Sequence, residues 1–180
     1  MATASKAPEL QQKVELFISC RDLVKMDKNS DSDPFVIVYL KSSRNNEFKE
    51  IGMTEVIYDN HYPDFSTQFL LDYYFEEEQT LRFDVYDEDK KGSKYLNHHD
   101  FLGSCTMCLG ELIHEPGSVM GKKLLNKKGQ YLKNKKTKKY THLIATVETV
   151  NKTDKKEKSM ILLQFKATNL PKMDLFGKCM

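Results

Sequence analysis

The chain has 180 residues, 39% of them hydrophobic, a size and composition that predict one domain with its own core. No run approaches the roughly 18 apolar residues of a membrane span, so we expect any contact with a bilayer to be peripheral. The net charge of +2 is unevenly distributed: residues 1–120 carry 12 Lys and Arg against 22 Asp and Glu, a net charge of −10, whereas residues 121–180 carry 16 against 4, a net charge of +12.

The four cysteines, Cys20, Cys105, Cys108 and Cys179, show no pairing pattern. The first residues also lack the apolar stretch of a secretory signal. Both observations favour a reducing, cytoplasmic setting, in which disulfides are not needed for folding.

Eight apolar runs, rich in β-branched and aromatic residues and separated by turn-forming residues, predict an all-β protein with few helical segments. Eight strands at this spacing are typical of an eight-stranded antiparallel β-sandwich. We therefore expect a flexible N-terminus at 1–12, a sandwich domain at 13–150 and a short C-terminal tail at 151–180. In chain order the predicted strands are 13–19, 35–40, 50–57, 66–72, 80–86, 102–109, 122–125 and 142–150.

Two segments near the end of the chain differ from the rest. Residues 121–139 contain nine lysines and little to bury, which predicts a hairpin or a mobile loop and favours a solvated face over a dedicated docking patch. Residues 151–158 form a polar linker, and 160–170 have the pattern of one more strand, which cannot form a domain by itself.

Two aspartate-rich loops are the candidate functional sites. The first contains Asp27 and Asp33 and ends at Pro34, where a predicted strand begins, and the second contains Asp87 and Asp89. In the strand before the second loop, the apolar residues of 81–85 share one face by the two-residue period, and the two aspartates continue the same parity. These carboxylates are therefore expected to project together.

Carboxylates gathered in one place repel one another and lose hydration, so they need a counter-ion or must take up protons. Ca²⁺ accepts about six to eight oxygen ligands in a tolerant geometry, whereas Mg²⁺ demands a stricter octahedron and Zn²⁺ prefers nitrogen or sulfur. The alternative is that the aspartates only cap backbone amides in turns. Taken together, the two oxygen-only loops favour a calcium site.

Three other readings have less support. An EF-hand loop starting at Asp27 fails because Ser32 stands where Gly is required. A zinc site would combine Cys105 and Cys108 with nearby histidines, but two cysteines three residues apart in a strand point to opposite faces and more readily fill packing positions. No Ser-His-Asp or Cys-His arrangement supports an enzyme, and no nucleic-acid partner is expected.

The two loops resemble those of a C2 domain, with Asp-x5-Asp-Pro-Phe-Val at 27–36, Val-Tyr-Asp-x-Asp at 85–89 and Asp-Phe-Leu-Gly at 100–103. The phrases at 13–21, 54–57, 63–65 and 81–87 are similar to the first C2 domain of the copine family, and the resemblance covers about 13–150. The insert before the last acidic position is longer than usual. By this resemblance the Ca²⁺ ligands are Asp27, Asp33, Asp87, Asp89 and Asp100.

The tail extends the resemblance. Residues 161–167 and 169–178 are similar to the start of a copine's second C2 domain, but the sequence stops at Met180. Copines carry a complete second C2 domain and a von Willebrand A-type domain. We therefore expect a truncated copine form or a fragment of one.

The resemblance implies a calcium-dependent phospholipid-binding module that is recruited from the cytoplasm to the plasma membrane or to other anionic membranes. Ca²⁺ would neutralise the loop carboxylates, and neighbouring side chains would then meet the lipid. The alternative is a calcium-insensitive protein-interaction module, or a competitor of full-length copines. The side chains expected to contact the membrane are Met26, Lys28, Lys91, Lys94 and Tyr95.

Overall fold

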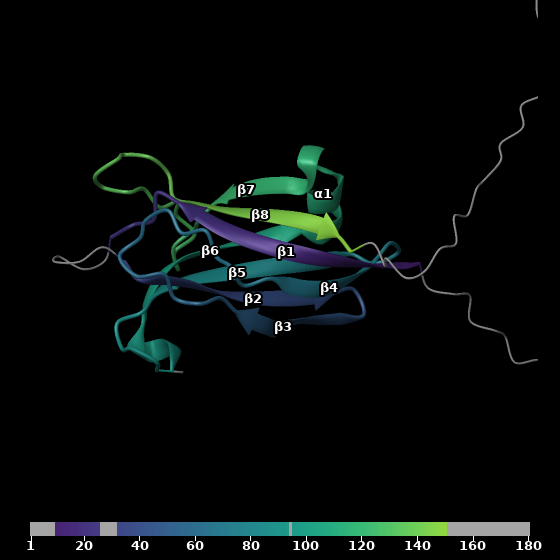
Figure 1. Ribbon diagram of the computed structural model, residues 1–180, viewed down its shortest axis with the longest axis horizontal. Coiled ribbons are helices and arrows are strands. Elements are labelled where there is room, and N and C mark those ends of the chain that lie inside the picture. The colour runs from purple at the N-terminus through teal and green to yellow at the C-terminus, as the bar shows by residue number, and fades with distance from the viewer. Residues whose placement is uncertain (1–9, 26–31, 94, 151–180) are drawn as a thin grey trace, which may run out of the picture.

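The computed structural model describes residues 10–25, 32–93 and 95–150. Within them, eight strands form two antiparallel four-stranded sheets, in the orders β4-β1-β8-β7 and β3-β2-β5-β6 (Figure 1). The predicted all-β antiparallel sandwich is therefore confirmed. The strands are β1 (Gln11–Arg21), β2 (Pro34–Ser42), β3 (Asn45–Met53), β4 (Phe69–Tyr74), β5 (Gln79–Asp87), β6 (Asp100–Cys108), β7 (Val119–Lys123) and β8 (His142–Thr149).

Each predicted strand overlaps an observed one, but the prediction for β3 was displaced. That strand was expected at 50–57 and instead spans Asn45–Met53. It lies at the edge of its sheet and pairs only with β2, and most of its side chains are exposed. An edge strand with little to bury carries no apolar alternation, so its limits could not be read from the sequence.

The core lies between the two sheets. In β1, every second residue from Val14 to Cys20 is buried, and β5 shows the same alternation from Gln79 to Asp87. The fully buried Leu16 of one sheet and Phe83 of the other belong to the same apolar cluster. Burying each such side chain contributes about 1.5–3 kcal/mol, so the alternation fixes which face of each strand turns inward.

One short helix, α1 (Leu109–His114), was not predicted. Its first residue had been assigned to the preceding strand, but the chain turns at Cys108, and Leu109 and Leu112 are both buried. Two apolar residues three apart fit one face of a helical turn as well as the end of a strand, so the pattern alone did not separate the two. The helix lies at the end of the sandwich opposite the aspartate loops (Figure 1).

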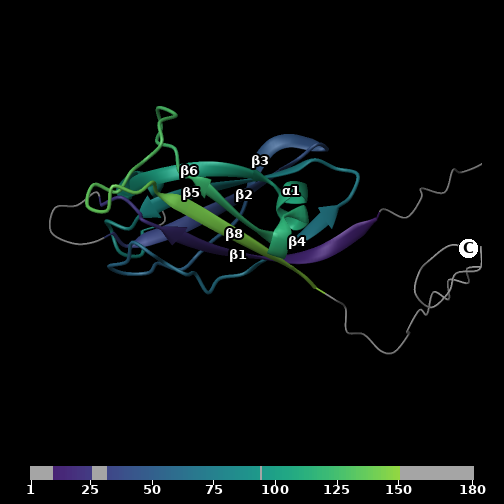
Figure 2. The ribbon, with the colours of Figure 1, turned by 90° about the horizontal axis from the view of Figure 1, so that it is seen from above.

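The lysine-rich segment between β7 and β8 lies at the same end as the segment between β5 and β6 (Figures 1 and 2). Isolated bridges pair Leu125 with Tyr131 and Lys133 with Tyr140, which confirms a hairpin-like course. As expected, little of the segment is buried: between residues 121 and 139, only Leu124 and Asn134 are. The apolar side chain of Leu124 faces the core and anchors the start of the segment.

Gly103 allows this segment to approach β6. Its φ of +137° is one that L side chains rarely adopt. A Cβ at this position would lie 2.7 Å from Leu132 Cδ1 and 3.0 Å from Leu124 Cβ. The β5–β6 register also shifts beside it, between Val85 and Tyr86. Only glycine therefore permits both the irregular ladder and the close contact.

Candidate metal site

Strand pairing brings the two aspartate loops together at one end of the sandwich. Asp87, the last residue of β5, faces Pro34 at the start of β2 and Asp100 at the start of β6. The backbone N–H of Asp33 donates to Asp87 Oδ1 at 2.6 Å, and the N–H of Glu88 donates to the carbonyl of Asp33 at 3.0 Å. The first loop is thus fastened directly to the second.

A third segment, between β3 and β4, joins the same end. Asp33 Oδ1 accepts a hydrogen bond from the N–H of Asp59 at 2.8 Å, and the N–H of Asn60 donates to the carbonyl of Ser32 at 3.0 Å. The Asp33 side chain therefore holds this segment in place, while its backbone holds Asp87. Sequence reasoning did not assign a role to Asp59.

Asp87 is the most constrained carboxylate of the site, with only 3% of the residue exposed. Burial raises the pKa of its carboxyl, and the nearby Asp89 and Asp33 carboxylates raise it further. The hydrogen bond from the Asp33 amide and the nearby Ser32 hydroxyl, which itself donates to the carbonyl of Val24, oppose the shift. Within the described part of the chain, Asp87 Oδ2 is buried without a hydrogen-bond partner. Such an atom costs about 1–3 kcal/mol, which a bound cation would offset.

The predicted Ca²⁺ ligands differ in how close they lie to Asp87. Asp33 and Asp87 lie together, Asp100 faces Asp87 across the ladder, and Asp89 is exposed but close enough to act on the Asp87 carboxyl. Asp27 lies outside the described residues. Among residues 10–25, 32–93 and 95–150, no three Asp, Glu, His or Cys side chains are grouped closely enough to hold a metal ion. The five-aspartate ligand set therefore stays a prediction.

The residues that are present nevertheless fit Ca²⁺ chemically. The donors at this end are carboxylate and backbone oxygens, and Ca²⁺ is the cation that accepts several oxygens in a flexible arrangement. The buried oxygen of Asp87, which has no hydrogen-bond partner among the described residues, is the observation that fits a bound cation. The structure gives no support to a zinc site formed by these cysteines and histidines, because Cys105 is buried and the side chains of His98 and His99 contact Ser93.

The long insert before Asp100 is folded around Ser93. Its hydroxyl lies 2.8 Å from His98 Nδ1, and its carbonyl accepts a hydrogen bond from His99 Nε2 at 3.0 Å. A short 3-10 turn, Leu96–His98, follows, and the buried His99 ring packs edge-on against Phe35 with centroids 5.3 Å apart. The extra residues are thus accommodated in a compact turn, and Asp100 still opens β6 opposite Asp87.

The predicted membrane-contact residues are only partly described. Tyr95 is 70% exposed, and the ammonium of Lys91 lies 5.2 Å from the centre of the Tyr58 ring. The Tyr58 hydroxyl also donates to Glu88 at 3.3 Å, a contact that sequence reasoning missed. Lys91 is therefore oriented by an aromatic ring at the loop end. Met26, Lys28 and Lys94 lie outside the described residues.

The lysine-rich segment supports the start of the first aspartate loop. Asn134 Nδ2 donates to the carbonyl of Leu23 at 2.8 Å, and the Thr141 hydroxyl donates to the carbonyl of Asp22 at 2.9 Å. The Tyr62 hydroxyl donates to the Asp22 side chain at 2.9 Å. Asn134 and Thr141 lie more than a hundred residues from their partners, so no local pattern could have revealed them.

Comparison with known proteins identifies the family to which the fold belongs. The model of the C2 domain family matches residues 13–125, so the chain belongs to the C2 domain family. The C2A domain of plant Extended Synaptotagmin 1 superposes with a TM-score of 0.52 at 20% identity, covering 78% of this chain and 96% of that one. The calcium-bound C2A and C2B domains of Extended Synaptotagmin 2 give a TM-score of 0.50 at 20% identity, covering 77% and 45%. At these identities the likeness concerns the fold alone.

A relative found by sequence comparison shows that, among C2 proteins, this chain resembles the copines. Copine-D of Dictyostelium discoideum is 39% identical over 124 residues, which are 68% of this chain and 23% of Copine-D. The chain is a copine-like C2 protein and spans about a quarter of the length of this relative. No helix among the described residues is long and apolar enough to cross a membrane.

Proposed function

We propose that this chain binds Ca²⁺ at the loop end of the sandwich and, once loaded, binds anionic phospholipid. One observation carries the proposal: within the described residues, Asp87 Oδ2 is buried without a hydrogen-bond partner, while the amide of Asp33 bonds to Asp87 Oδ1 and Asp100 stands opposite Asp87 in the β5–β6 ladder. A calcium-bound C2 structure of the same fold and the likeness to Copine-D support it. The chain would act as a binding module in the cytoplasm, not as an enzyme, and would be recruited to the plasma membrane or to other anionic membranes.

The ligands proposed for Ca²⁺ are Asp27, Asp33, Asp87, Asp89 and Asp100. When bound, Ca²⁺ would neutralise these carboxylates and leave coordination positions open to lipid phosphate or carboxylate oxygens. The chain's own residues would do the rest. Asp33 would keep its backbone on Asp87 and its side chain on Asp59, so the loops would hold their relative positions as charge is neutralised.

Side chains beside the loops would make the contact with lipid. Tyr95 and the neighbouring Leu96 are exposed and apolar enough to enter the interfacial region. Lys91 would pair with head groups, as Lys28 and Lys94 are predicted to do, and each lysine near an anionic surface contributes about 1 kcal/mol. Met26 is a further predicted apolar contact.

Co-sedimentation with phosphatidylserine vesicles, with and without Ca²⁺, tests the proposal when it is combined with calorimetric Ca²⁺ titration. We expect Asp33→Asn and Asp87→Asn to abolish both the calcium heat and the calcium-dependent sedimentation. Asp72→Asn is the matched control, because this aspartate forms an exposed ion pair with Lys13 on β1 and lies away from the loops. Equal sedimentation of all variants with and without Ca²⁺ would contradict the proposal and favour a calcium-insensitive interaction module.

A further inference from the structure

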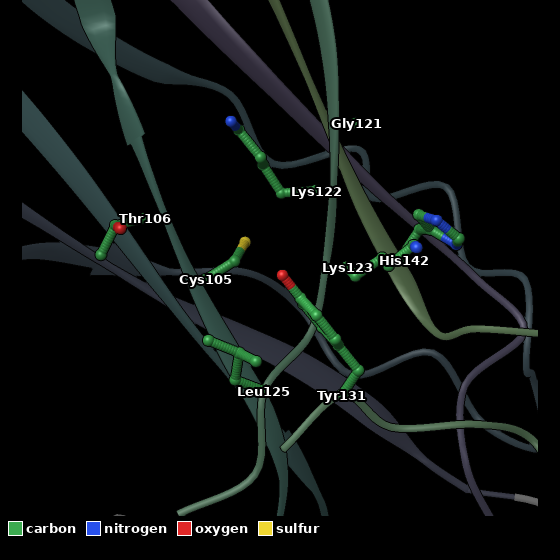
Figure 3. Close-up of a pocket in the computed structure, with 8 residues that line it drawn as sticks. All are labelled: Cys105, Thr106, Gly121, Lys122, Lys123, Leu125, Tyr131 and His142. Carbon is green, nitrogen blue, oxygen red and sulfur yellow. The ribbon is translucent and has the colours of Figure 1, made fainter. Parts of the chain in front are cut away.

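A cleft on one side of the sandwich lies between β6 and β7, the edge strands of the two different sheets (Figure 3). It has a volume of about 380 Å³, and we call it the lysine cleft. Leu125, which lines it, bonds through both its N–H and its carbonyl to Ser104 of β6 at 2.9 Å. The other lining residues used below are Cys105 of β6, Gly121, Lys122 and Lys123 of β7, and Tyr131.

The edge of β7 that borders the cleft has backbone groups without a strand partner. Within the described residues, β7 pairs only with β8. The N–H of Leu124, directly after β7, donates to the carbonyl of Thr141 at 2.9 Å, on the β8 side. Backbone groups alternate in direction along an antiparallel ladder, so those of Gly121 and Lys123 point away from β8. Their N–H groups and carbonyls are therefore available to another strand.

Gly121 is a glycine that the fold of the described residues does not require. Its φ is not positive, unlike that of Gly103. A Cβ added to it would meet only Ile144 Cγ1 at 3.8 Å, which is an ordinary contact. Glycine inside a strand lowers stability, and it often marks a point at which another backbone approaches closely. Its place on the open edge of β7 therefore favours such an approach.

The charge of the cleft indicates which kind of strand would bind. The sequence from Val119 to Val147 contains nine lysines and no Asp or Glu. In the described part of the chain, no carboxylate forms an ion pair with Lys122 or Lys123. Cys105 adds no negative charge, because burial raises the pKa of its thiol to about 12. The field attracts an acidic segment, whereas the lysines on β7 of a second copy would be repelled.

Lys122 and Lys123 project to opposite faces of their sheet, because they are adjacent in a strand. Lys122 stands opposite the buried Leu143, and Lys123 stands opposite His142. One compact anion therefore does not meet both ammonium groups. An added strand does, because its own successive side chains alternate between the same two faces and stand opposite those of β7. Two adjacent acidic residues in that strand would pair with one lysine each.

Aromatic rings hold one of these ammonium groups in position. Lys123 Nζ lies 4.1 Å from the centre of the Tyr140 ring and 5.4 Å from that of the Tyr131 ring. Cation–π contacts orient a lysine without neutralising its charge. Less side-chain freedom is then lost when a carboxylate binds, which is a form of preorganisation.

We propose that the lysine cleft binds an extended acidic segment of another protein, which adds to the open edge of β7 as a fifth strand of its four-stranded sheet. The backbone groups of Gly121 and Lys123 supply the hydrogen bonds, and Lys122 and Lys123 select two adjacent acidic side chains. In this mode of recognition, main-chain hydrogen bonds give affinity and the side chains give specificity. The site needs no Ca²⁺, so it is independent of the function proposed for the aspartate loops.

Calorimetry in EDTA with synthetic peptides tests this mode of binding without any substitution in the chain. The probe is a short capped peptide of valine and threonine with two adjacent glutamates at its centre. Methylation of every second backbone nitrogen leaves one edge of the peptide free, so its binding should persist. Methylation of every backbone nitrogen blocks both edges at unchanged charge, and we expect the affinity to fall about tenfold or more. Equal affinities of the two methylated peptides would overturn the proposal.

Substitutions in the chain test where the unmethylated peptide binds. Lys122→Gln with Lys123→Gln should weaken binding about threefold or more. Gly121→Pro removes an N–H on the open side and blocks strand pairing there, so we expect a loss of about tenfold or more. The matched control is Lys135→Gln with Lys139→Gln, which removes the same charge from exposed positions that do not line the cleft. We expect this control to change the affinity by less than about twofold.

Losses confined to the cleft variants and to the fully methylated peptide would support the added strand. Equal losses in the two lysine pairs, or no binding of the unmethylated peptide, would overturn it. If Gly121→Pro does not fold, the lysine pairs and the methylated peptides still decide the outcome. Because every measurement is made in EDTA, failure of the calcium proposal would leave these results unchanged.

Discussion

Two charged regions differ in how the fold accommodates their charge. The aspartate corner contains Asp33, Asp87 and Asp100 at the loop end, and the lysine cleft, between β6 and β7, is lined by Lys122 and Lys123. At the corner, Asp87 is buried among other carboxylates, and one of its oxygens has no partner within the described residues. In the cleft, Lys122 and Lys123 are exposed, and Lys123 rests on tyrosine rings. The corner therefore carries an unfavourable free energy that a cation would relieve, whereas the cleft is already stable without a ligand.

This difference separates two kinds of charged site. A buried, uncompensated carboxylate makes folding stability depend on the ion that satisfies it, so binding should be visible in unfolding experiments. Exposed lysines contribute little to folding, so substituting them should leave the free energy of unfolding of the ligand-free chain almost unchanged. Substitutions at the corner, at the contacts that connect the two regions and at their periphery can test the distinction.

The largest effect is expected from Asp87→Asn. In EDTA the variant should unfold with a free energy about 1 kcal/mol higher than the native chain, because a neutral amide is buried at lower cost than a charged carboxylate. At a free Ca²⁺ concentration about a thousand times the dissociation constant, the native chain should gain about 4 kcal/mol, which the variant should lack. Urea unfolding with and without Ca²⁺ measures both changes, and Asp72→Asn should behave like the native chain.

A somewhat smaller loss is expected from Gly103→Ala, which disturbs the contact between β6 and the lysine-rich segment. The new methyl group would clash with Leu132 and Leu124, and the φ of +137° would be strained. We expect the free energy of unfolding to fall by about 3 kcal/mol. Gly129→Ala is the control, because its φ is also positive but nothing lies within 4 Å of the added Cβ. Equal losses in the two variants would show that strain, and not the close contact, decides the outcome.

Asn134→Ala tests the connection between the lysine-rich segment and the first aspartate loop. The variant leaves the buried carbonyl of Leu23 without its donor, so we expect a loss of about 2 kcal/mol in the free energy of unfolding. We also expect weaker Ca²⁺ binding, because the start of the loop that contains Asp27 is no longer fixed. Calorimetry in Ca²⁺ measures the second effect, and an unchanged calcium affinity would show that the segment supports the fold alone.

The smallest effect concerns Glu55, a carboxylate whose hydrogen bonds are satisfied. Burial alone would raise the pKa of its carboxyl, but hydrogen bonds from Thr67 and Ser66 outweigh this effect and lower it. Glu55 therefore stabilises the fold above its unfolded pKa of about 4.5, and this stability is lost as the pH falls through the lowered folded value. Glu55→Gln should cost about 1 kcal/mol at neutral pH and progressively less below about pH 4.5.

The contribution of Asp87 to stability should depend on pH in the opposite direction to that of Glu55. Its folded pKa is raised, so its unfavourable contribution is fully present above that value and is relieved as the pH falls toward the unfolded pKa. In EDTA, the stability difference between Asp87→Asn and the native chain should therefore shrink on acidification. Unfolding curves recorded across this pH range distinguish the two carboxylates, and a difference that grows at low pH would contradict the assignment for Asp87.

The sequence by itself determined the sandwich and the approximate position of seven of its eight strands, because alternating burial imposes a two-residue period wherever one face of a strand meets the core. It also placed Asp33, Asp87 and Asp100 at strand ends that a sandwich can bring together. The sequence did not predict the limits of β3 or the presence of the helix α1, because an exposed edge strand and a short apolar turn carry no distinctive hydrophobic period.

Only the tertiary structure decided how these pieces meet. The amide of Asp33 reaches the side chain of Asp87, and Asn134 reaches Leu23, across chain separations that no local pattern encodes. The lysine cleft exists because β7 and β6 lie at the edges of different sheets and the chain crosses between them at Leu125. Local periodicity shows which side chains turn inward, but the strand order determines which charges become neighbours, because distant segments meet only when the sheets assemble.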